Sequence, residues 1–230
     1  MKKYDESVRN PHFKTKEGDT VLYPFSPPLF KTKVDSSFTN DLIEEGRKLQ
    51  NKDNYSENLA GNLKNGGSYH YHKPFVKKSE KYLSNYVMRF VNGISDHYDT
   101  DYYLKRFLKI YNNNTESYDI GTIKLDSLWI NFQKNYDFNP PHTHGGALSF
   151  VVFCKVPPKI FEVQANSNFQ HAGSIVFEYG QDISELMVSS FCYKPEINDL
   201  FIFPSHLKHF VPPFWVDEER ISVSGNFVVV

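Results

Sequence analysis

The sequence lacks the features that would place it in several specialised classes of protein. Its 230 residues include only two cysteines, and the formal net charge is −1 with a pI near 6.8. The basic start "MKKYDESVRN" is followed by no apolar segment of the kind that a secretory signal contains, and no apolar run approaches the roughly 20 residues of a membrane helix. We therefore expect a cytoplasmic protein with no membrane partner and no nucleic-acid partner.

Aromatic residues are abundant by contrast. The chain holds 20 Phe and 15 Tyr, and 40% of its residues are apolar. This composition is sufficient for one large core and favours β-structure. Cys154 and Cys192 lie in apolar, strand-like runs, so we expect two buried free thiols. We expect a single domain over residues 1–230, divided into a supporting region (1–119) and a core (120–230).

The supporting region predicts helices and little sheet. "SSFTNDLIEEGRKLQ" is typical of a capped helix, and apolar residues at three- and four-residue steps predict a second helix over 78–98. A strand is expected at 29–34. The segment 51–75 is rich in Asn and Gly and predicts a long loop. His70 and His72 within it form a His-x-His pair with no matching third ligand, which we interpret as solvated or as a lid.

From residue 120 the hydrophobic pattern changes to a period of two. The runs are short, rich in β-branched and aromatic residues, and separated by turn residues. They are "TIKLDSLWINF", "ALSFVVFCKV", "IFEVQ", "SIVFEY", "ELMVSSFCY", "LFIF" and "RISVSGNFVVV". So many short strands with few helical intervals predict an α+β fold, with a β-jelly-roll core and the helices packed on one outer face.

The stretch "NPPHTHGG" places two histidines at a spacing that suits a metal. On a strand, His142 and His144 would point to the same face and could bind one ion. A third ligand must come from elsewhere, and "PSHLKHF" offers His209, with His206 as the competing candidate. Enough chain for several strands lies between the two motifs, so His209 could return to the same end of a barrel.

Arg220 and Ser222 begin a strand whose polar residues alternate with apolar ones. If that face lines the barrel mouth, the arginine fork and the serine hydroxyl would bind one carboxylate of a dicarboxylate, while the metal holds its other end. The alternative is a half-buried strand with its polar face in water.

These residues resemble the Fe(II)- and 2-oxoglutarate-dependent oxygenases, and most closely those related to prolyl 4-hydroxylases that occur in phages and marine bacteria. The resemblance rests on "WINF", "NPPHTHGGALSFVVFCKVP", "FIFPSHLKHFVPP" and "ERISVSGNF", and more faintly on "NLAGNL". It implies a double-stranded β-helix, Fe(II) and 2-oxoglutarate as cofactors, and O2 as cosubstrate. It also implies a hydroxylase that releases succinate and CO2.

The resemblance also assigns residues. It implies His142 as the first metal ligand, His209 as the distal one, and Arg220 with Ser222 on the 2-oxoglutarate carboxylate. "WINF" and "GNF" suggest that Asn131 and Asn226 line the cofactor pocket.

His144 departs from the family pattern, which has a carboxylate at this position. Either His144 is a third imidazole ligand, or it turns away and leaves the position open, or a carboxylate comes from elsewhere, with Asp137 the nearest upstream.

Two other classes compete with the oxygenase. A cupin also uses His-x-His on a jelly roll, but it needs a glutamate where this chain has Leu148 and Ser149. A non-catalytic jelly-roll binding module would fit the many tyrosines, yet has no need of the Arg220–Ser222 pair. The sequence does not identify the substrate, although the resemblance suggests a peptide or protein side chain. Segments 51–75 and 157–172 are the expected specificity elements.

Overall fold

The computed structural model describes residues 12–22, 27–50, 54–58, 61, 63–97, 105, 107–112, 117–162, 171–181 and 189–230. No helix in these ranges is long and apolar enough to cross a membrane. Some segments singled out above lie partly outside the described residues. They are half of "NLAGNL", the middle of the segment 157–172, and the first four residues of "ELMVSSFCY".

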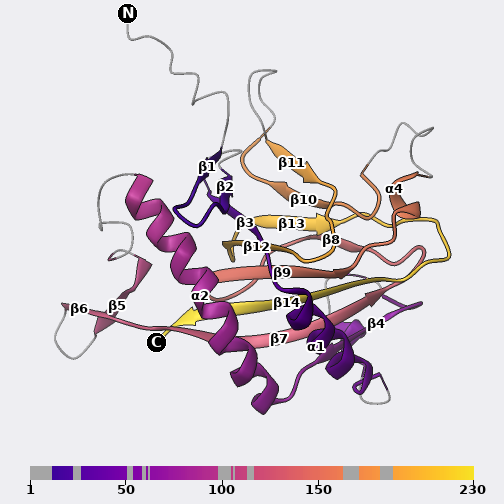
Figure 1. Cartoon of the computed structure of the whole chain (residues 1–230), viewed down its shortest axis with the longest axis horizontal. Coiled ribbons are helices and arrows are strands. Elements are labelled where there is room, and N and C mark those ends of the chain that lie inside the picture. The colour runs from indigo at the N-terminus through magenta and orange to yellow at the C-terminus, as the bar shows by residue number, and fades with distance from the viewer. Residues whose placement is uncertain are drawn as a thin grey trace, which may run out of the picture.

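Two antiparallel sheets form the centre of the described chain (Figure 1). The larger sheet has the order β1-β2-β3-β12-β9-β14-β7-β4, and the smaller has the order β11-β10-β13-β8. The larger sheet consists of β1 (His12–Lys14), β2 (Thr20–Leu22), β3 (Leu29–Lys33), β4 (Gly67–His70), β7 (Ile123–Gln133), β9 (Leu148–Lys155), β12 (Asp199–Pro204) and β14 (Arg220–Val229). The smaller sheet consists of β8 (Asn139–His142), β10 (Ile175–Glu178), β11 (Ser190–Tyr193) and β13 (Lys208–Val211). Strands β5 (Lys109–Asn112) and β6 (Ser117–Ile120) pair with each other as a separate antiparallel sheet.

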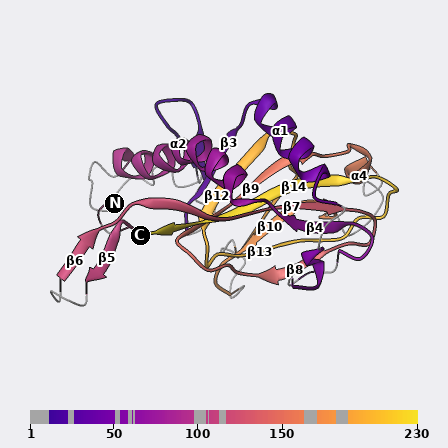
Figure 2. The same cartoon turned by 90° about the horizontal axis from the view of Figure 1, so that it is seen from below.

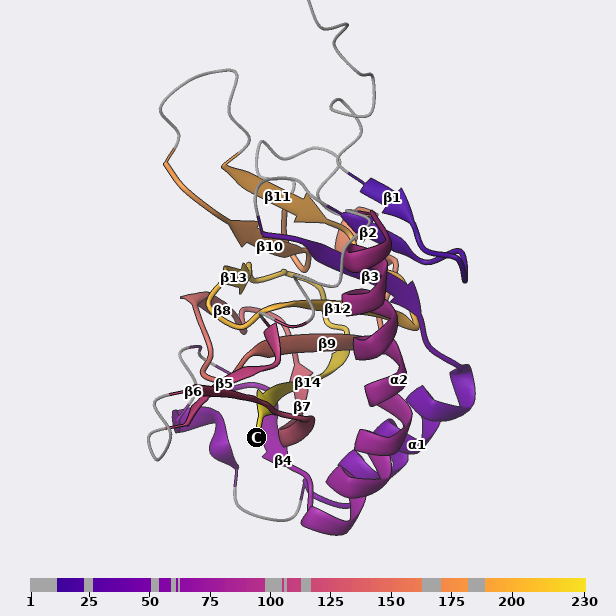
Figure 3. The ribbon, with the colours of Figure 1, turned by 90° about the vertical axis from the view of Figure 1, so that its left-hand side faces the viewer.

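Helices α1 (Ser36–Arg47) and α2 (Lys73–His97) cover the outer face of the larger sheet, so helices, larger sheet and smaller sheet form successive layers (Figures 2 and 3). In α2, Leu83, Val87 and Phe90 are at most 1% exposed. Burying each such side chain stabilises the fold by about 1.5–3 kcal/mol. The predicted helix over 78–98 is confirmed, but it begins earlier, because Pro74 lies in its first turn, where a missing N–H costs no helical hydrogen bond.

Strand β9 shows why the two sheets stack. All its residues except the last are buried, because both of its faces are covered. Phe150 and Val152 belong to the apolar cluster beneath the helices, whereas Val151 and Phe153 belong to a second cluster between the sheets. The near-continuous apolar run of this strand therefore reflects two cores, and the predicted α+β jelly roll is confirmed.

The interpretation of 51–75 as a loop is wrong in part. The segment contains a 3-10 helix, η2 (Tyr55–Asn58), the edge strand β4 and the start of α2. The strand escapes local pattern reading because pairing with β7 creates it. A Cβ on Gly66 would lie 1.6 Å from the Phe132 carbonyl oxygen, so the glycine permits the close approach of the two backbones.

The predicted strand "IFEVQ" is also wrong. Its described part lies in a short helix, α4 (Lys159–Glu162). The helix follows Pro157 and Pro158, whose carbonyl oxygens accept hydrogen bonds from the N–H groups of Ile160 and Phe161. The proline pair starts a helical turn that the apolar composition of the run does not reveal.

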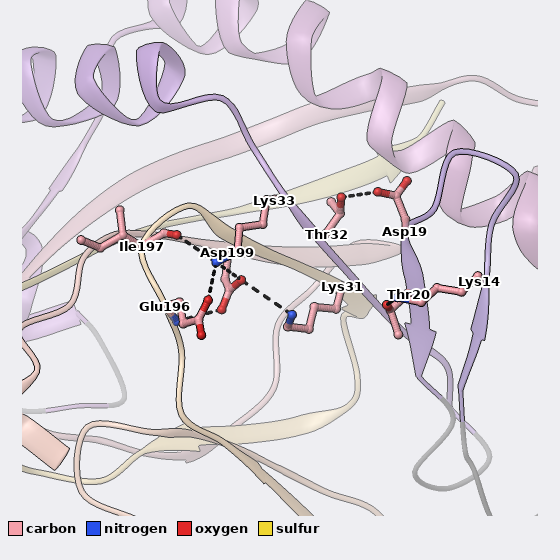
Figure 4. Close-up of polar contacts among 9 residues, drawn as sticks. All are labelled: Lys14, Asp19, Thr20, Lys31, Thr32, Lys33, Glu196, Ile197 and Asp199. Atoms are coloured by element: carbon pink, nitrogen blue, oxygen red, sulfur yellow. Dashed lines mark hydrogen bonds and ion pairs between the residues drawn. The ribbon is translucent and has the colours of Figure 1, made fainter. Parts of the chain in front are cut away.

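A buried carboxylate joins β3 to the core (Figure 4). Asp199 is fully buried, and its Oδ1 lies 3.1 Å from Lys33 Nζ and 3.8 Å from Lys31 Nζ. Its Oδ2 accepts a hydrogen bond from the Glu196 N–H at 2.8 Å. Residues before 119 thus contribute strands to the same sheet as the later residues.

Candidate active site

A cavity of about 330 Å³ opens between the two sheets, where β7, β14 and β4 face β8 and β13. All the residues predicted for the site line this cavity. They are Asn131, His142, His144, His209, Arg220, Ser222 and Asn226. Segments from widely separated parts of the sequence therefore meet at one place.

The pairing of β7 with β14 supplies the polar wall of the cavity. In the register of the two strands, Arg220 lies opposite Gln133, and Ser222 lies opposite Asn131. Further along, Asn226 Oδ1 accepts a hydrogen bond from Ser149 Oγ at 2.7 Å. Because side chains alternate between faces, the polar residues point into the cavity while their neighbours pack under the helices.

His142 and His209 are direct cross-strand neighbours on β8 and β13. Their ring centroids are 4.4 Å apart. His142 Nδ1 lies 2.7 Å from the Pro140 carbonyl oxygen, and His209 Nδ1 lies 2.9 Å from that of Leu207. Each Nδ1–H donates to a backbone carbonyl, which leaves the Nε2 lone pair of both rings directed elsewhere.

His144 completes the cluster from the turn after β8. Its backbone N–H donates to the Ser205 carbonyl oxygen at 2.9 Å, which fixes the turn. Its ring centroid lies 4.8 Å from that of His142 and 5.1 Å from that of His209. One nitrogen from each ring lies within 4.8 Å of the others, a separation compatible with one shared ion.

The three imidazoles are held in the form that binds metals. Burial, and to a lesser extent the neighbouring His142, lowers the pKa of His209 to about 3 and that of His144 to about 4. Burial also lowers the pKa of His142. All three rings are therefore neutral at pH 7, with lone pairs available.

Arg220 is a buried cation with incomplete hydrogen bonding. It is 2% exposed, its guanidinium lies 4.9 Å from the centre of the Phe153 ring, and burial lowers its pKa to about 10. Nη1 donates to Gln133 Oε1 at 2.8 Å, whereas Nε and Nη2 have no hydrogen-bond partner among the described residues. Two unpaired N–H groups on a buried charge favour an anionic ligand.

Gln133, which sequence reasoning missed, holds this arginine in place. Its Nε2 donates to the Asp137 carbonyl oxygen at 2.8 Å, so its Oε1 remains directed at Arg220. No local pattern marks it, because its role comes from the pairing of β7 with β14, which lie far apart in the sequence. Trp129, whose ring lies 5.4 Å from that of His144, was missed in the same way.

The other candidates lie apart from the histidine cluster. The Asp137 carboxylate is buried and accepts the backbone N–H groups of Asn65 at 3.0 Å and Lys134 at 2.9 Å, so it stabilises a turn and does not replace the missing carboxylate. His206 is exposed and outside the cluster. His70 lines the cavity, in edge contact with Tyr55 at 4.9 Å between ring centroids.

Residues 127–226 match the family model described as "Putative 2OG-Fe(II) oxygenase". Residues 127–226 therefore carry a 2OG-Fe(II) oxygenase core. No curated protein sequence matches the chain. Among solved structures, this chain is similar to a Pseudomonas putida prolyl-4-hydroxylase, with 11% identity and a TM-score of 0.54 over 87% of this chain and 91% of the other.

It is also similar to the non-haem alpha-ketoglutarate-dependent epimerase SnoN from nogalamycin biosynthesis. The identity is 13% and the TM-score is 0.50, over 87% of this chain and 76% of the epimerase. At such identities the two likenesses show a shared fold.

Fe(II) and 2-oxoglutarate are the cofactors of this oxygenase class, and the donor set in the cavity fits both. Neutral imidazole nitrogens suit iron(II). The unpaired N–H groups of Arg220 suit a carboxylate that enters the same cavity. A single cavity thus offers a metal-binding end and an anion-binding end.

Proposed function

We propose that this protein is a hydroxylase that uses Fe(II), 2-oxoglutarate and O2 to oxidise a peptide or protein side chain, with proline as the first candidate, and that releases succinate and CO2. One observation carries the proposal. Three neutral imidazoles and a buried arginine with unpaired N–H groups line the same cavity.

In this proposal His142, His144 and His209 hold the iron. All three are neutral, so the protein adds no negative charge at the ion, and the carboxylate at the oxo-acid end of 2-oxoglutarate would be the anionic ligand of the assigned set. Bound together, the iron and 2-oxoglutarate supply the oxidising chemistry, and the protein fixes their positions. His144 takes the position of the expected carboxylate, which is consistent with its place in the cluster.

Arg220 and Ser222 bind the far carboxylate of 2-oxoglutarate. The Nε and Nη2 groups of the arginine offer a two-pronged fork, and Gln133 keeps the guanidinium from turning. The Ser222 side chain follows Arg220 on the same face of β14 and adds a hydroxyl. Asn131 and Asn226 contribute neutral polar groups to the wall.

The character of the cavity supports an uncharged substrate group. Arg220 is the one Lys, Arg, Asp or Glu among the described lining residues, and the proposal assigns its free N–H groups to 2-oxoglutarate. A cationic side chain would find no counter-charge there. A prolyl ring is neutral and largely apolar, and the Pseudomonas putida protein of the same fold is a prolyl-4-hydroxylase.

An anaerobic titration of metal-free protein with Fe(II) and 2-oxoglutarate tests the proposal. We expect a visible charge-transfer band when the oxo acid chelates protein-bound iron, and its loss in His142→Ala. His206→Ala serves as the matched control, because that ring lies outside the cluster. A folded protein that gives no band with both ligands would refute the assigned site.

The substrate class has its own measurement. Iron-loaded protein is incubated with 2-oxoglutarate, O2 and a set of proline-containing peptides, and peptide mass and succinate are followed together. We expect one peptide to gain an oxygen atom in proportion to succinate. Succinate formation stimulated by another substrate class alone would overturn the assignment to peptides.

A further inference from the structure

Strand β14 carries polar side chains along the whole cavity, and they lie at different distances from its anion-binding end. Arg220, Ser222, Ser224 and Asn226 share one face of the strand and line the cavity. The guanidinium of Arg220 lies over the Phe153 ring, and Phe153 is opposite Ser222 in the register of β9 with β14. The anion-binding end is therefore level with Ser222. Because a β-strand rises about 3.3 Å per residue, the backbone of Asn226 lies about 13 Å beyond that of Ser222.

The cofactor is too short to bridge this distance. The two carboxyl carbons of 2-oxoglutarate are joined by four carbon–carbon bonds and lie about 5 Å apart in the extended molecule. A hydrogen bond adds about 3 Å, which still falls well short of the distance of about 13 Å along the strand. A cofactor whose far carboxylate is held by Arg220 and Ser222 therefore does not reach Asn226.

The histidine cluster lies between the two ends of the cavity. Trp129 on β7 is opposite Ser224 on β14, and its ring lies 5.4 Å from that of His144. Ser127, two residues from Trp129 along β7, is opposite Asn226. The order along the cavity is thus the anion-binding end, the histidines, and then the pair of Ser127 with Asn226. This last part is the space that the cofactor leaves to a substrate.

Two serines fix the orientation of the Asn226 amide. Its Oδ1 accepts a hydrogen bond from the buried Ser149 Oγ at 2.7 Å, and its Nδ2 donates to Ser127 Oγ at 3.2 Å. A primary amide has two N–H donors and two acceptor lone pairs, so one N–H and one lone pair are left over from these two contacts. Because Asn226 is half-buried and lines the cavity, a molecule bound there can meet both groups.

The backbone of a peptide is the complement of these two groups. In an extended chain the N–H and the C=O of one residue point to the same side, as they do when two strands pair. One residue can thus accept from the free N–H of Asn226 and donate to its free lone pair. Ser127, Ser149 and Asn226 are all uncharged, so an ionic group would find no opposite charge here.

We propose that Asn226, held by Ser127 and Ser149, binds the backbone of an extended peptide substrate beside the residue that is oxidised. The inference rests on the proposed function and deepens it, because it makes Asn226 a specificity-determining residue and removes it from the 2-oxoglutarate pocket. Asn131 stays at the cofactor end, since it lies opposite Ser222. Recognition through the backbone leaves the side chain of the substrate residue free to approach the histidine cluster.

Two affinities measured on the same variants test the proposal. Binding of 2-oxoglutarate is followed by the charge-transfer band of the anaerobic iron complex, and binding of the proline-containing peptides by calorimetry of that complex, in which no turnover occurs. For Asn226→Ala we expect 2-oxoglutarate affinity within about twofold of that of the unaltered protein, and peptide affinity about tenfold weaker, because two hydrogen bonds are lost. Asn92→Ala, at an exposed asparagine of α2, is the matched control and should change neither affinity.

Ester analogues of the tightest-binding peptide locate the contact. In each analogue an ester oxygen replaces one backbone N–H. We expect one analogue to bind the unaltered protein about fivefold more weakly than the peptide does, because Asn226 loses a donor. Asn226→Ala should bind this analogue and the peptide equally well, because the contact is already absent.

Three results would count against the inference, and they differ in what they remove. If Asn226→Ala weakens 2-oxoglutarate binding about tenfold, the residue belongs to the cofactor pocket and the inference is overturned. If the variant binds the peptides as tightly as the unaltered protein, Asn226 only joins the two serines, and the inference is overturned again. If the unaltered iron complex shows its band but binds no peptide, the proposed peptide class falls, and the inference falls with it while the cofactor site stands.

Discussion

Replacing Arg220 by methionine should stabilise the protein while removing 2-oxoglutarate binding. Without 2-oxoglutarate the guanidinium is buried, and within the described part of the chain it has one hydrogen-bond partner and two unpaired nitrogen groups. A buried charge without a counter-ion is unfavourable in the folded state, and an apolar side chain of similar length removes it.

The magnitude follows from two opposing terms. Burial lowers the pKa of Arg220 to about 10, which corresponds to a free energy of about 3 kcal/mol against the charged form in the folded protein. Methionine removes this term but leaves Gln133 Oε1 without its donor, at a cost of about 1–3 kcal/mol. We therefore expect a net gain of about 1 kcal/mol, or a Tm about 2–4 °C higher.

Thermal unfolding with and without 2-oxoglutarate measures both effects. The unaltered protein should gain about 2.7 kcal/mol of stability at a 2-oxoglutarate concentration 100 times its Kd, whereas Arg220→Met should gain none. Arg220→Lys is the control, because it keeps a positive charge and lacks the planar fork.

Two outcomes would refute the reasoning. If the ligand-free Arg220→Met protein is less stable than the unaltered one by more than about 1 kcal/mol, the buried guanidinium does not destabilise the ligand-free fold. If 2-oxoglutarate still shifts the Tm of the methionine variant, its carboxylate is bound elsewhere.

The remaining predictions concern the cluster, a turn and the thiols. His209→Ala should abolish Co(II) binding in a fluorescence titration while His206→Ala leaves it intact, and the reverse result would exchange their roles. Asp137→Ala should lower the free energy of unfolding in urea by about 2–4 kcal/mol, since two backbone N–H groups lose their acceptor, and a loss under 1 kcal/mol would contradict this role. Burial raises the pKa of both thiols, so both should react slowly with a thiol reagent, as measured by mass spectrometry. Half-buried Cys192 should be labelled slowly, and faster as the pH rises, whereas buried Cys154 should be labelled only after unfolding.

The sequence predicted those parts of the fold that follow from periodic patterns. The alternation in "RISVSGNF" indicated which face of β14 is polar, and the helical period over 78–98 located most of α2. Cys154 and Cys192 are free thiols as expected, although only Cys154 is buried and Cys192 is half-buried. In each case a residue's environment was set by neighbours along its own element.

The rest depended on contacts between distant segments. Strand β4 exists because β7 pairs with it, and nothing in the Gly- and Ser-rich run at its start favours a strand. Gln133 carries an ordinary polar side chain. Its importance arises from Arg220, which the pairing of β7 with β14 brings beside it.

The cavity is bordered by the free edges of both sheets. Strand β4 ends the larger sheet, β8 ends the smaller, and among the described strands no ladder joins the two. Gly61 lies against Asn139, and Leu63 lines the cavity, so residues outside any strand close this side. Because this segment pairs with no strand, residues can be inserted into it or removed from it without breaking interstrand hydrogen bonds. Over evolution, or in directed redesign, the range of accepted substrates could therefore diverge through insertions near residue 60 while the strands that carry the chemistry stay fixed.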